Sequence, residues 1–176
     1  MIQDHLLEHG LSWLNNLPRE RAFEELLKCC GSKNWAHMLE EKRPFGSIGE
    51  LYSSADDVWS RLDQNDWLEA FRAHPKIGEK KAESQVSATS QQWSGQEQSG
   101  INGAAQSTLE RLADLNSQYE AKFGYIFIVC ATGKSPQEML AILAARIDNE
   151  PSTELPIAAG EQAKITRLRI AKLLGQ

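Results

Sequence analysis

The residues best suited to chemistry are a histidine followed directly by a proline, His74 and Pro75, and a polar group further along the chain, Ser94, Glu97 and Gln98. An imidazole with an ordinary pKa near ~6.5 can take up and release a proton at neutral pH. A carboxylate can orient such a ring, while hydroxyl and amide groups can hold the polar atoms of a ligand. The set favours proton transfer on a small substrate, without naming a reaction.

The proline determines the local conformation of His74. Because the ring of Pro75 clashes with a helical backbone at the preceding residue, His74 is driven into an extended conformation. A helix through residues 67–71 should therefore end near His74 and present the imidazole at a helix end or in a loop, outside the core. The alternative is a histidine that only terminates the helix and bonds a carbonyl.

Arg146 stands where an apolar residue is expected. At 3.6 residues per turn it lies on the same helical stripe as Met139, Ile142 and Leu143. A guanidinium there must meet an anion, since an unpaired buried charge is very costly. One alternative is a buried pair with a glutamate, or a stem that carries the charge to solvent. The other is a fork that grips the carboxylate of a ligand.

Glu97 also has a purely structural alternative. Ser94 and Glu97 have the spacing of a capping box, which by itself would account for both residues at the start of a helix. Gln98 and Gly100 are not required by that account. We expect no metal site: His5 and His9 could share a helix face, but two ligands without a third make a poor centre, and no zinc motif occurs.

The composition excludes several classes of protein. A chain of 176 residues with 41% hydrophobic and 24% charged residues is expected to fold as one domain, residues 1–176. A net charge of −5 argues against a nucleic-acid partner, and no apolar run is long enough to predict a membrane span. Neither a signal peptide nor a peroxisomal ending is visible, so we expect a cytoplasmic protein. The three cysteines do not form a disulfide framework.

Apolar residues recur at helical spacing along most of the chain, which predicts an all-α fold. Ser32 and Ser135 are expected to begin helices, and Gly31 and Gly124 to end them. The expected helices cover residues 6–14, 18–30, 33–39, 51–62, 67–71, 103–123, 136–149 and 155–174.

Two segments do not follow this pattern. Residues 79–102 are rich in Ser, Gln and Gly, which fits a linker between two domains or a functional loop. We favour the loop, because neither flank is large enough to bury a core of its own. Residues 125–130 have the composition of a strand but no partner strand, so we expect buried chain, helical or extended.

The order and spacing of these motifs resemble the 2-oxo-4-hydroxy-4-carboxy-5-ureidoimidazoline (OHCU) decarboxylases of the urate pathway. The likeness covers almost the whole chain and includes Trp35 and the Arg43-Pro44-Phe45 loop. Its principal motifs are His74-Pro75-Lys76-Ile77-Gly78, Ser94-x-x-Glu97-Gln98-x-Gly100, Tyr119-x-x-Lys122-Phe123-Gly124-Tyr125-x-Phe127-Ile128, Glu138-Met139-Leu140 and Arg146-x-x-Asn149.

The resemblance implies an all-helical enzyme that needs no cofactor and converts OHCU to (S)-allantoin and carbon dioxide. It implies that His74 is the principal catalytic residue, with Glu97 beside it. It further implies that Ser94 and Gln98 hold polar groups of the substrate, that Arg146 binds the substrate carboxylate, and that Pro75 belongs to the binding site.

Two other functions remain as alternatives. One is a helical protein that binds a purine-derived anion without turnover, and the other is a cofactor-free lyase or hydrolase acting on a related small acid. The partner hypotheses are a small-molecule substrate, a homodimer and functional coupling to a hydroxyisourate hydrolase.

Overall fold

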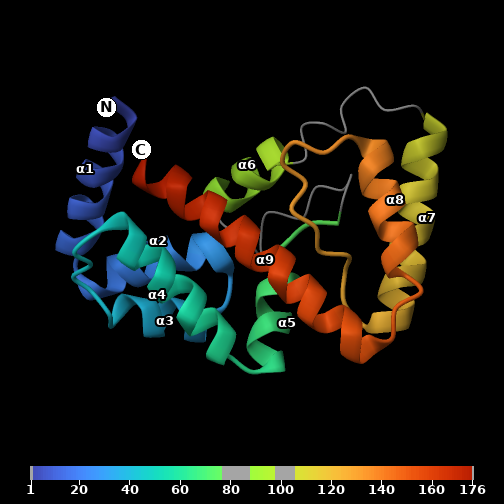
Figure 1. Cartoon of the computed structure of the whole chain (residues 1–176), viewed down its shortest axis with the longest axis horizontal. Coiled ribbons are helices and arrows are strands. Elements are labelled where there is room, and N and C mark those ends of the chain that lie inside the picture. The colour runs from blue at the N-terminus through green and yellow to red at the C-terminus, as the bar shows by residue number, and fades with distance from the viewer. Residues whose placement is uncertain (1, 77–87, 98–105, 176) are drawn as a thin grey trace. The chain divides into compact units, whose positions relative to one another are not determined.

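The computed structural model describes residues 2–76, 88–97 and 106–175, and for residues 2–6 the backbone alone. In these ranges the chain forms nine helices and no strand, which confirms the all-α prediction. The helices, drawn in Figure 1, are α1 (Ile2–Asn16), α2 (Arg19–Cys30), α3 (Lys33–Glu40), α4 (Ile48–Arg61), α5 (Gln64–Arg72), α6 (Ala88–Glu97), α7 (Gln106–Phe123), α8 (Pro136–Arg146) and α9 (Pro151–Leu174).

Helix ends follow the local chemistry of the sequence. The Ser32 hydroxyl accepts the Trp35 backbone N–H at 3.3 Å and so caps α3. Ser135 and Glu138 form the expected capping box at the start of α8. Gly31 ends α2 with φ 90°, a left-handed conformation that glycine adopts without steric cost. These short-range predictions are confirmed.

The structure corrects the predicted polar loop and several predicted helix bounds, among them the end of α8 at Arg146 rather than residue 149. Residues 88–97 form helix α6, although the polar composition predicted a loop or linker. Helix α9 begins at Pro151 rather than near residue 155, and Pro156 lies inside it. Of the expected polar loop, residues 79–87 and 98–102 lie outside the described residues. Polar helices of this kind have no apolar stripe from which a sequence pattern could identify them.

The described residues group into two compact units. Unit 1 contains residues 1–70 and 163–176, and unit 2 contains residues 71–162. Helices α5 and α9 each contribute to both units. Within unit 1, α2 packs against α3, and α4 against both α1 and α3; within unit 2, α7 packs against α8. The expectation of one domain over residues 1–176 stays a prediction.

Two side chains of unit 1, Trp35 and Arg43, donate hydrogen bonds to backbone carbonyls of other elements. Trp35 is fully buried and its indole N–H donates to the Ala55 carbonyl at 3.1 Å. Nη1 of Arg43 donates to the Leu14 and Leu17 carbonyls at 2.7 and 2.9 Å, within and just beyond the last turn of α1. Gly10 is buried, and a Cβ there would lie 1.9 Å from the Leu174 carbonyl oxygen.

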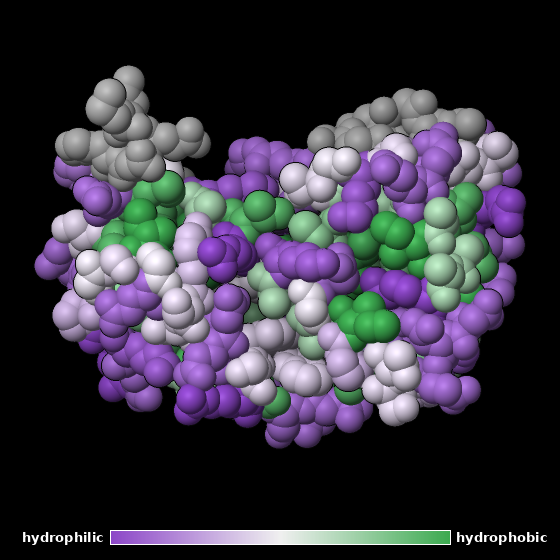
Figure 2. Space-filling model, in the orientation of Figure 1, coloured by the Kyte–Doolittle hydropathy of each residue, from purple (hydrophilic) through white to green (hydrophobic). Residues whose placement is uncertain are grey.

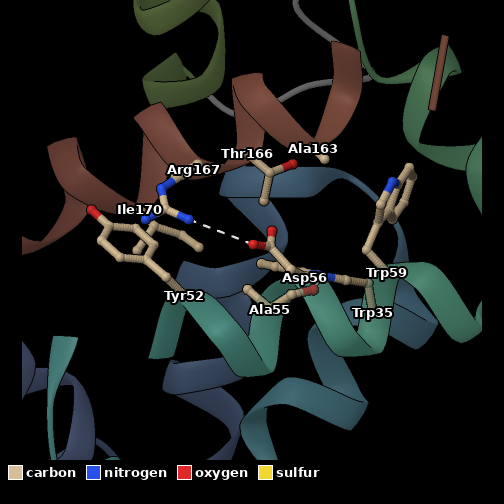
Figure 3. Close-up of a pocket in the computed structure, with 9 residues that line it drawn as sticks. All are labelled: Trp35, Tyr52, Ala55, Asp56, Trp59, Ala163, Thr166, Arg167 and Ile170. Carbon is tan, nitrogen blue, oxygen red and sulfur yellow. Dashed lines mark hydrogen bonds and ion pairs between the residues drawn. The ribbon is translucent and has the colours of Figure 1, made fainter. Parts of the chain in front are cut away.

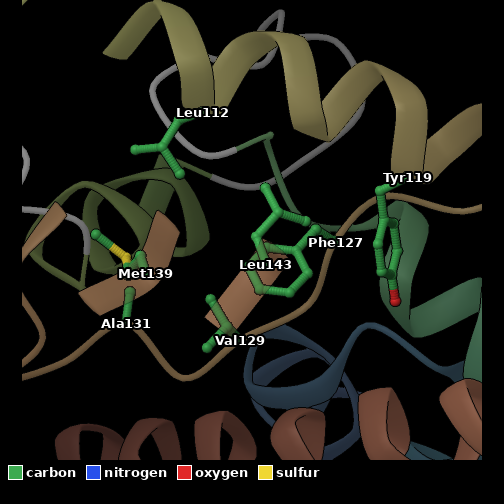
Figure 4. Packing of buried hydrophobic residues seen from close by; sticks show 7 residues of the cluster. All are labelled: Leu112, Tyr119, Phe127, Val129, Ala131, Met139 and Leu143. Carbon is green, nitrogen blue, oxygen red and sulfur yellow. The ribbon is translucent and has the colours of Figure 1, made fainter. Parts of the chain in front are cut away.

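Unit 2 is built around an extended segment that crosses its core. Residues 126–131 are extended without forming a strand, and Phe127, Val129 and Ala131 alternate into the cluster of Figure 4. Helix α7 contributes Leu112 and Tyr119 to this cluster, and α8 contributes Met139 and Leu143. The expectation of buried chain holds for residues 127–130, whereas Tyr125 and Ile126 are half-buried.

Hydrophilic and hydrophobic residues are interspersed on the face shown in Figure 2. The large apolar side chains that are exposed in the described ranges come from α1, α3 and α9, and are Trp13, Met38, Ile157 and Leu168. No helix among the described residues combines the length and apolar character needed to cross a bilayer.

Candidate functional site

His74 lies just beyond the end of α5, as the following proline predicts. The helix ends at Arg72, and the His74 backbone N–H still donates to the Phe71 carbonyl at 3.1 Å. The side chain is only 8% exposed, so the expectation of a ring outside the core is wrong. Its Nε2 atom lies 2.7 Å from Oε1 of Gln162, a residue of α9 with no exposed surface. This buried partner, rather than a backbone carbonyl, holds the ring.

Helix α6 carries the serine and the glutamate of the second motif. Ser94 is buried beside Trp93, and Glu97, the last residue of α6, is half-buried. Both residues lie in the final turns of the helix and not at its start. A capping box therefore does not explain them, because capping requires the serine to precede the first turn. Gln98 and Gly100 lie outside the described residues.

The extended segment of unit 2 is fixed at Cys130 from two sides. The Cys130 N–H donates to Oε2 of Glu161 at 2.7 Å, and Nζ of Lys134 donates to the Cys130 carbonyl at 2.7 Å. Burial raises the pKa of the Cys130 thiol; Lys134 lowers it, and the carboxylates of Glu161 and Glu97 raise it further. The charge of Glu97 affects the Cys130 thiol, so the end of α6 lies near the extended segment. Since Glu161 of α9 bonds the same segment, all three elements meet in one region of unit 2.

Arg146 forms the buried pair with a glutamate that was one of its two sequence-based interpretations. It is 7% exposed, and its Nε donates to Oε1 of Glu154 at 2.8 Å while Nη1 donates to the Ile128 carbonyl at 2.7 Å. The guanidinium also lies 4.7 Å from the centre of the Phe127 ring. Because Nη2 also donates to Glu154, all three nitrogens of the guanidinium donate to protein atoms. The role of Arg146 as a substrate anchor stays a prediction.

Glu154 is the centre of this buried network. It has no exposed surface, and it accepts from Tyr119, from Arg146 and, through Oε2, from Asn149 at 2.8 Å. Burial raises the pKa of Tyr119, and its hydrogen bond to Glu154 raises it further, so the phenol stays protonated and donates. The network ties α7, α8 and α9 together beneath the extended segment.

A recess in unit 1 contains none of the predicted site residues. It encloses about 230 Å³, a volume that includes open solvent, between α3, α4 and α9. Figure 3 shows Arg167 reaching Asp56, at 3.5 Å, above the Tyr52 ring. Both charged side chains are more than half exposed, so the pair is a weak one. Across the described residues, no group of three His, Cys, Asp or Glu side chains could hold a metal ion; the His5 side chain is not among them.

Three buried or half-buried residues of this region were missed by sequence reasoning: Glu154, Glu161 and Gln162. Glu154 had an indirect signal, because a buried arginine requires an acidic partner and α9 begins shortly after Arg146. Gln162 had none, since its partner His74 is 88 residues away in the sequence. Glu161 had none either, because it bonds a backbone N–H that any residue could supply.

Comparison with known proteins identifies the class to which this fold and site belong. The chain matches the family model described as OHCU decarboxylase over residues 15–171. The uric acid degradation bifunctional protein TTL of Arabidopsis thaliana is 40% identical over 150 residues, which are 85% of this chain and 46% of that protein. The 2-oxo-4-hydroxy-4-carboxy-5-ureidoimidazoline decarboxylase of Xenopus laevis is 31% identical over 75% of this chain and 75% of that protein.

A solved structure agrees with this match. The crystal structure of an OHCU decarboxylase in the presence of (S)-allantoin has a TM-score of 0.74 and 41% identity, and it covers 87% of this chain and 99% of that one. The described residues are all helical or irregular, and they hold a buried histidine on a buried glutamine, which is compatible with that class of enzyme. The chain belongs to the OHCU decarboxylase family, as the sequence motifs indicated. It spans less than half the length of the bifunctional relatives from Arabidopsis thaliana and Bacillus subtilis.

Proposed function

We propose that this protein converts OHCU to (S)-allantoin and carbon dioxide in uric acid degradation, without a cofactor. The observation that carries the proposal is the family match over residues 15–171. It is supported by the relative from Xenopus laevis, which is named for this decarboxylation, and by the similar OHCU decarboxylase whose structure was obtained in the presence of (S)-allantoin.

The substrate itself can accept the electrons that the reaction releases. When the bond to the carboxylate breaks, its electron pair moves into the imine and carbonyl system of the ring, and a proton replaces the lost carbon dioxide. His74 takes the proton of the 4-hydroxyl or delivers a proton to the developing carbanion, with Glu97 beside it. A positioned acid–base group of this kind typically contributes about 10²–10⁴-fold to the rate. Delivery from one face gives a single enantiomer.

The remaining proposed site residues bind rather than react. Ser94 and Gln98 hold polar groups of the ring and the ureido chain, and Pro75 shapes the wall beside His74. Arg146 is proposed to bind the substrate carboxylate. This binding must not be too strong, because negative charge leaves the carboxylate in the transition state. The pairing of Arg146 with Glu154 supports a structural role as well, and the two roles predict different outcomes for the variants described in the Discussion.

The wider setting follows from the same proposal. We expect the reaction in the cytoplasm, carried out by one domain over residues 1–176, with a homodimer as the expected assembly. Functional coupling to a hydroxyisourate hydrolase is proposed because relatives from Arabidopsis thaliana and Bacillus subtilis are named bifunctional proteins of uric acid degradation.

The test generates fresh OHCU in the cuvette with urate oxidase and hydroxyisourate hydrolase and then adds this protein. Ultraviolet absorbance follows substrate loss, and circular dichroism follows the chirality of allantoin. Fast loss with only (S)-allantoin formed supports the proposal. A rate equal to spontaneous decay, with measurable ligand binding, would instead indicate a binding protein.

Two variants assign the role of His74. Since the ring is buried, His74→Ala removes packing as well as chemistry, so His74→Asn is measured beside it as a polar replacement of smaller disruption. Both variants should lose turnover by at least about 10²-fold while the Asn variant keeps a wild-type thermal transition. Near-normal turnover in either variant would remove His74 from the mechanism.

A further inference from the structure

The imidazole of His74 is held by a residue that no motif identifies. Gln162 has no exposed surface, and its Oε1 lies 2.7 Å from Nε2 of His74, which is itself 8% exposed. A buried amide–imidazole bond at this distance restricts the ring in both position and rotation. The side chain that supplies it comes from the middle of α9, 88 residues further along the chain.

The chemistry of the amide determines which ring nitrogen carries the proton. A carbonyl oxygen only accepts, so Nε2 must donate, and in the neutral ring Nδ1 is then the nitrogen with a lone pair. Because the amide is uncharged, it selects the tautomer without placing a second charge beside the ring. The geometry therefore specifies the orientation of the imidazole and, through the amide oxygen, its tautomer.

The same turn of α9 also holds the extended segment of unit 2. Glu161, the neighbour of Gln162, accepts the Cys130 backbone N–H at 2.7 Å. Adjacent residues of a helix point in directions about 100° apart, so one turn can hold two different segments of chain. One turn of α9 thus holds both His74 and the extended segment at Cys130 by hydrogen bonds.

We propose that Gln162 is a positioning residue for the decarboxylation: it fixes the tautomer and orientation of His74, the residue proposed to exchange a proton with the substrate. This inference rests on the proposed function, because it assumes that His74 exchanges the proton. It adds a residue and a tautomer of His74 to that function.

The test compares two replacements of Gln162, one without an acceptor oxygen and one with an acceptor oxygen that also carries charge. Gln162→Met keeps the length of the side chain and removes the acceptor, whereas Gln162→Glu keeps an acceptor oxygen at the same place. Gly160→Ala is the control on the same helix, because a Cβ at that exposed position meets nothing within 4 Å. Nitrogen-15 NMR of labelled histidine, with the His74→Asn variant for assignment, reports the tautomer directly.

We expect the wild-type protein, Gln162→Glu and Gly160→Ala to show His74 with a proton on Nε2. Gln162→Met should show a mixture of tautomers and a kcat lowered roughly tenfold, about the effect of one buried hydrogen bond, with KM within about twofold of wild type. A merely structural role would lower the thermal transition and leave the tautomer unchanged. Either that result, or wild-type kcat in Gln162→Met, would overturn the proposal.

The two proposals can fail separately. If the wild-type protein does not turn over OHCU, the proposed function fails, and the NMR comparison still decides whether Gln162 selects the tautomer. If His74→Asn abolishes turnover while Gln162→Met leaves tautomer and kcat unchanged, the proposed function stands and the role of Gln162 is refuted.

Discussion

Removal of Glu154 should be among the most destabilising single changes in unit 2. Its carboxylate has no exposed surface and receives hydrogen bonds from Arg146, Tyr119 and Asn149. Glu154→Leu leaves the guanidinium of Arg146, itself 7% exposed, without an anion. Breaking a buried pair in this way typically costs about 3–5 kcal/mol. A chain of this length then melts about 6–20 °C lower, at roughly 2–4 °C per kcal/mol.

The loss of stability in Glu154→Leu is attributed to the unpaired charge of Arg146. A double variant separates this loss from the loss of the glutamate side chain itself. Replacing both partners, Arg146→Met with Glu154→Leu, removes the orphaned charge and should recover at least about 2 kcal/mol relative to Glu154→Leu alone. The matched control is Asp56→Ala, which breaks the exposed Arg167–Asp56 pair in unit 1 and should cost less than about 1 kcal/mol.

Urea and thermal unfolding followed by circular dichroism provide the free energies, and the OHCU assay provides kcat and KM for each variant. If Arg146 acts only through its pair, the double variant recovers turnover together with stability. If Arg146 also anchors the substrate carboxylate, stability recovers while KM stays raised. A loss of less than about 1 kcal/mol in unfolding free energy for Glu154→Leu would refute the reasoning, because a buried guanidinium without an anion destabilises the fold by more than that.

Three further changes test other parts of the fold. Gly10→Ala should destabilise the protein by about 1–3 kcal/mol in urea unfolding, because its Cβ would lie 1.9 Å from a backbone oxygen. The control Gly49→Ala should be neutral or stabilising, because the nearest atom to its Cβ lies at 3.7 Å. Ser135→Ala should cost about 1 kcal/mol by loss of the α8 cap, and an unchanged unfolding midpoint would contradict the capping account. Burial raises the pKa of Cys30 from 9.0 to about 12. The stability from its neutral thiol is therefore full below pH 9 and lost as pH rises toward 12, so Cys30→Ala should show a flatter decline in unfolding free energy there.

Local chemistry was predictable from the sequence because its partners are near in the chain. Ser32 and Ser135 cap the helices that follow them, and Gly31 ends the helix before it, through contacts within a few residues. Pro75 ends α5 for the same reason. Helix α6 was missed because its Ser- and Gln-rich sequence has no apolar stripe, and only the folded chain shows that Ser90, Trp93 and Ser94 are buried.

The site was predictable in residue type more than in geometry. The types of His74, Ser94 and Glu97 indicate their chemistry, but the burial of His74 depends on Gln162, which lies 88 residues away. Similarly, the sequence placed Arg146 on an apolar stripe and required an anion. Glu154 satisfies that requirement from the next helix, and no short-range pattern could choose between a protein carboxylate and a ligand carboxylate.

The division of α9 has a consequence for how the chain folds as it is synthesised. Unit 1 contains residues 1–70 but needs residues 163–176 to be complete, while unit 2 is contained in residues 71–162. Chains emerge from the ribosome at about 5–20 residues per second and tend to fold from the N-terminus. Here that order is reversed for the last step: the segment that carries His74 and Gln162 is fully available before unit 1 receives its final helical turns. Until then, apolar side chains of unit 1 that line the same recess as Ile170 of α9, such as Trp35 and Trp59, stay uncovered by that helix.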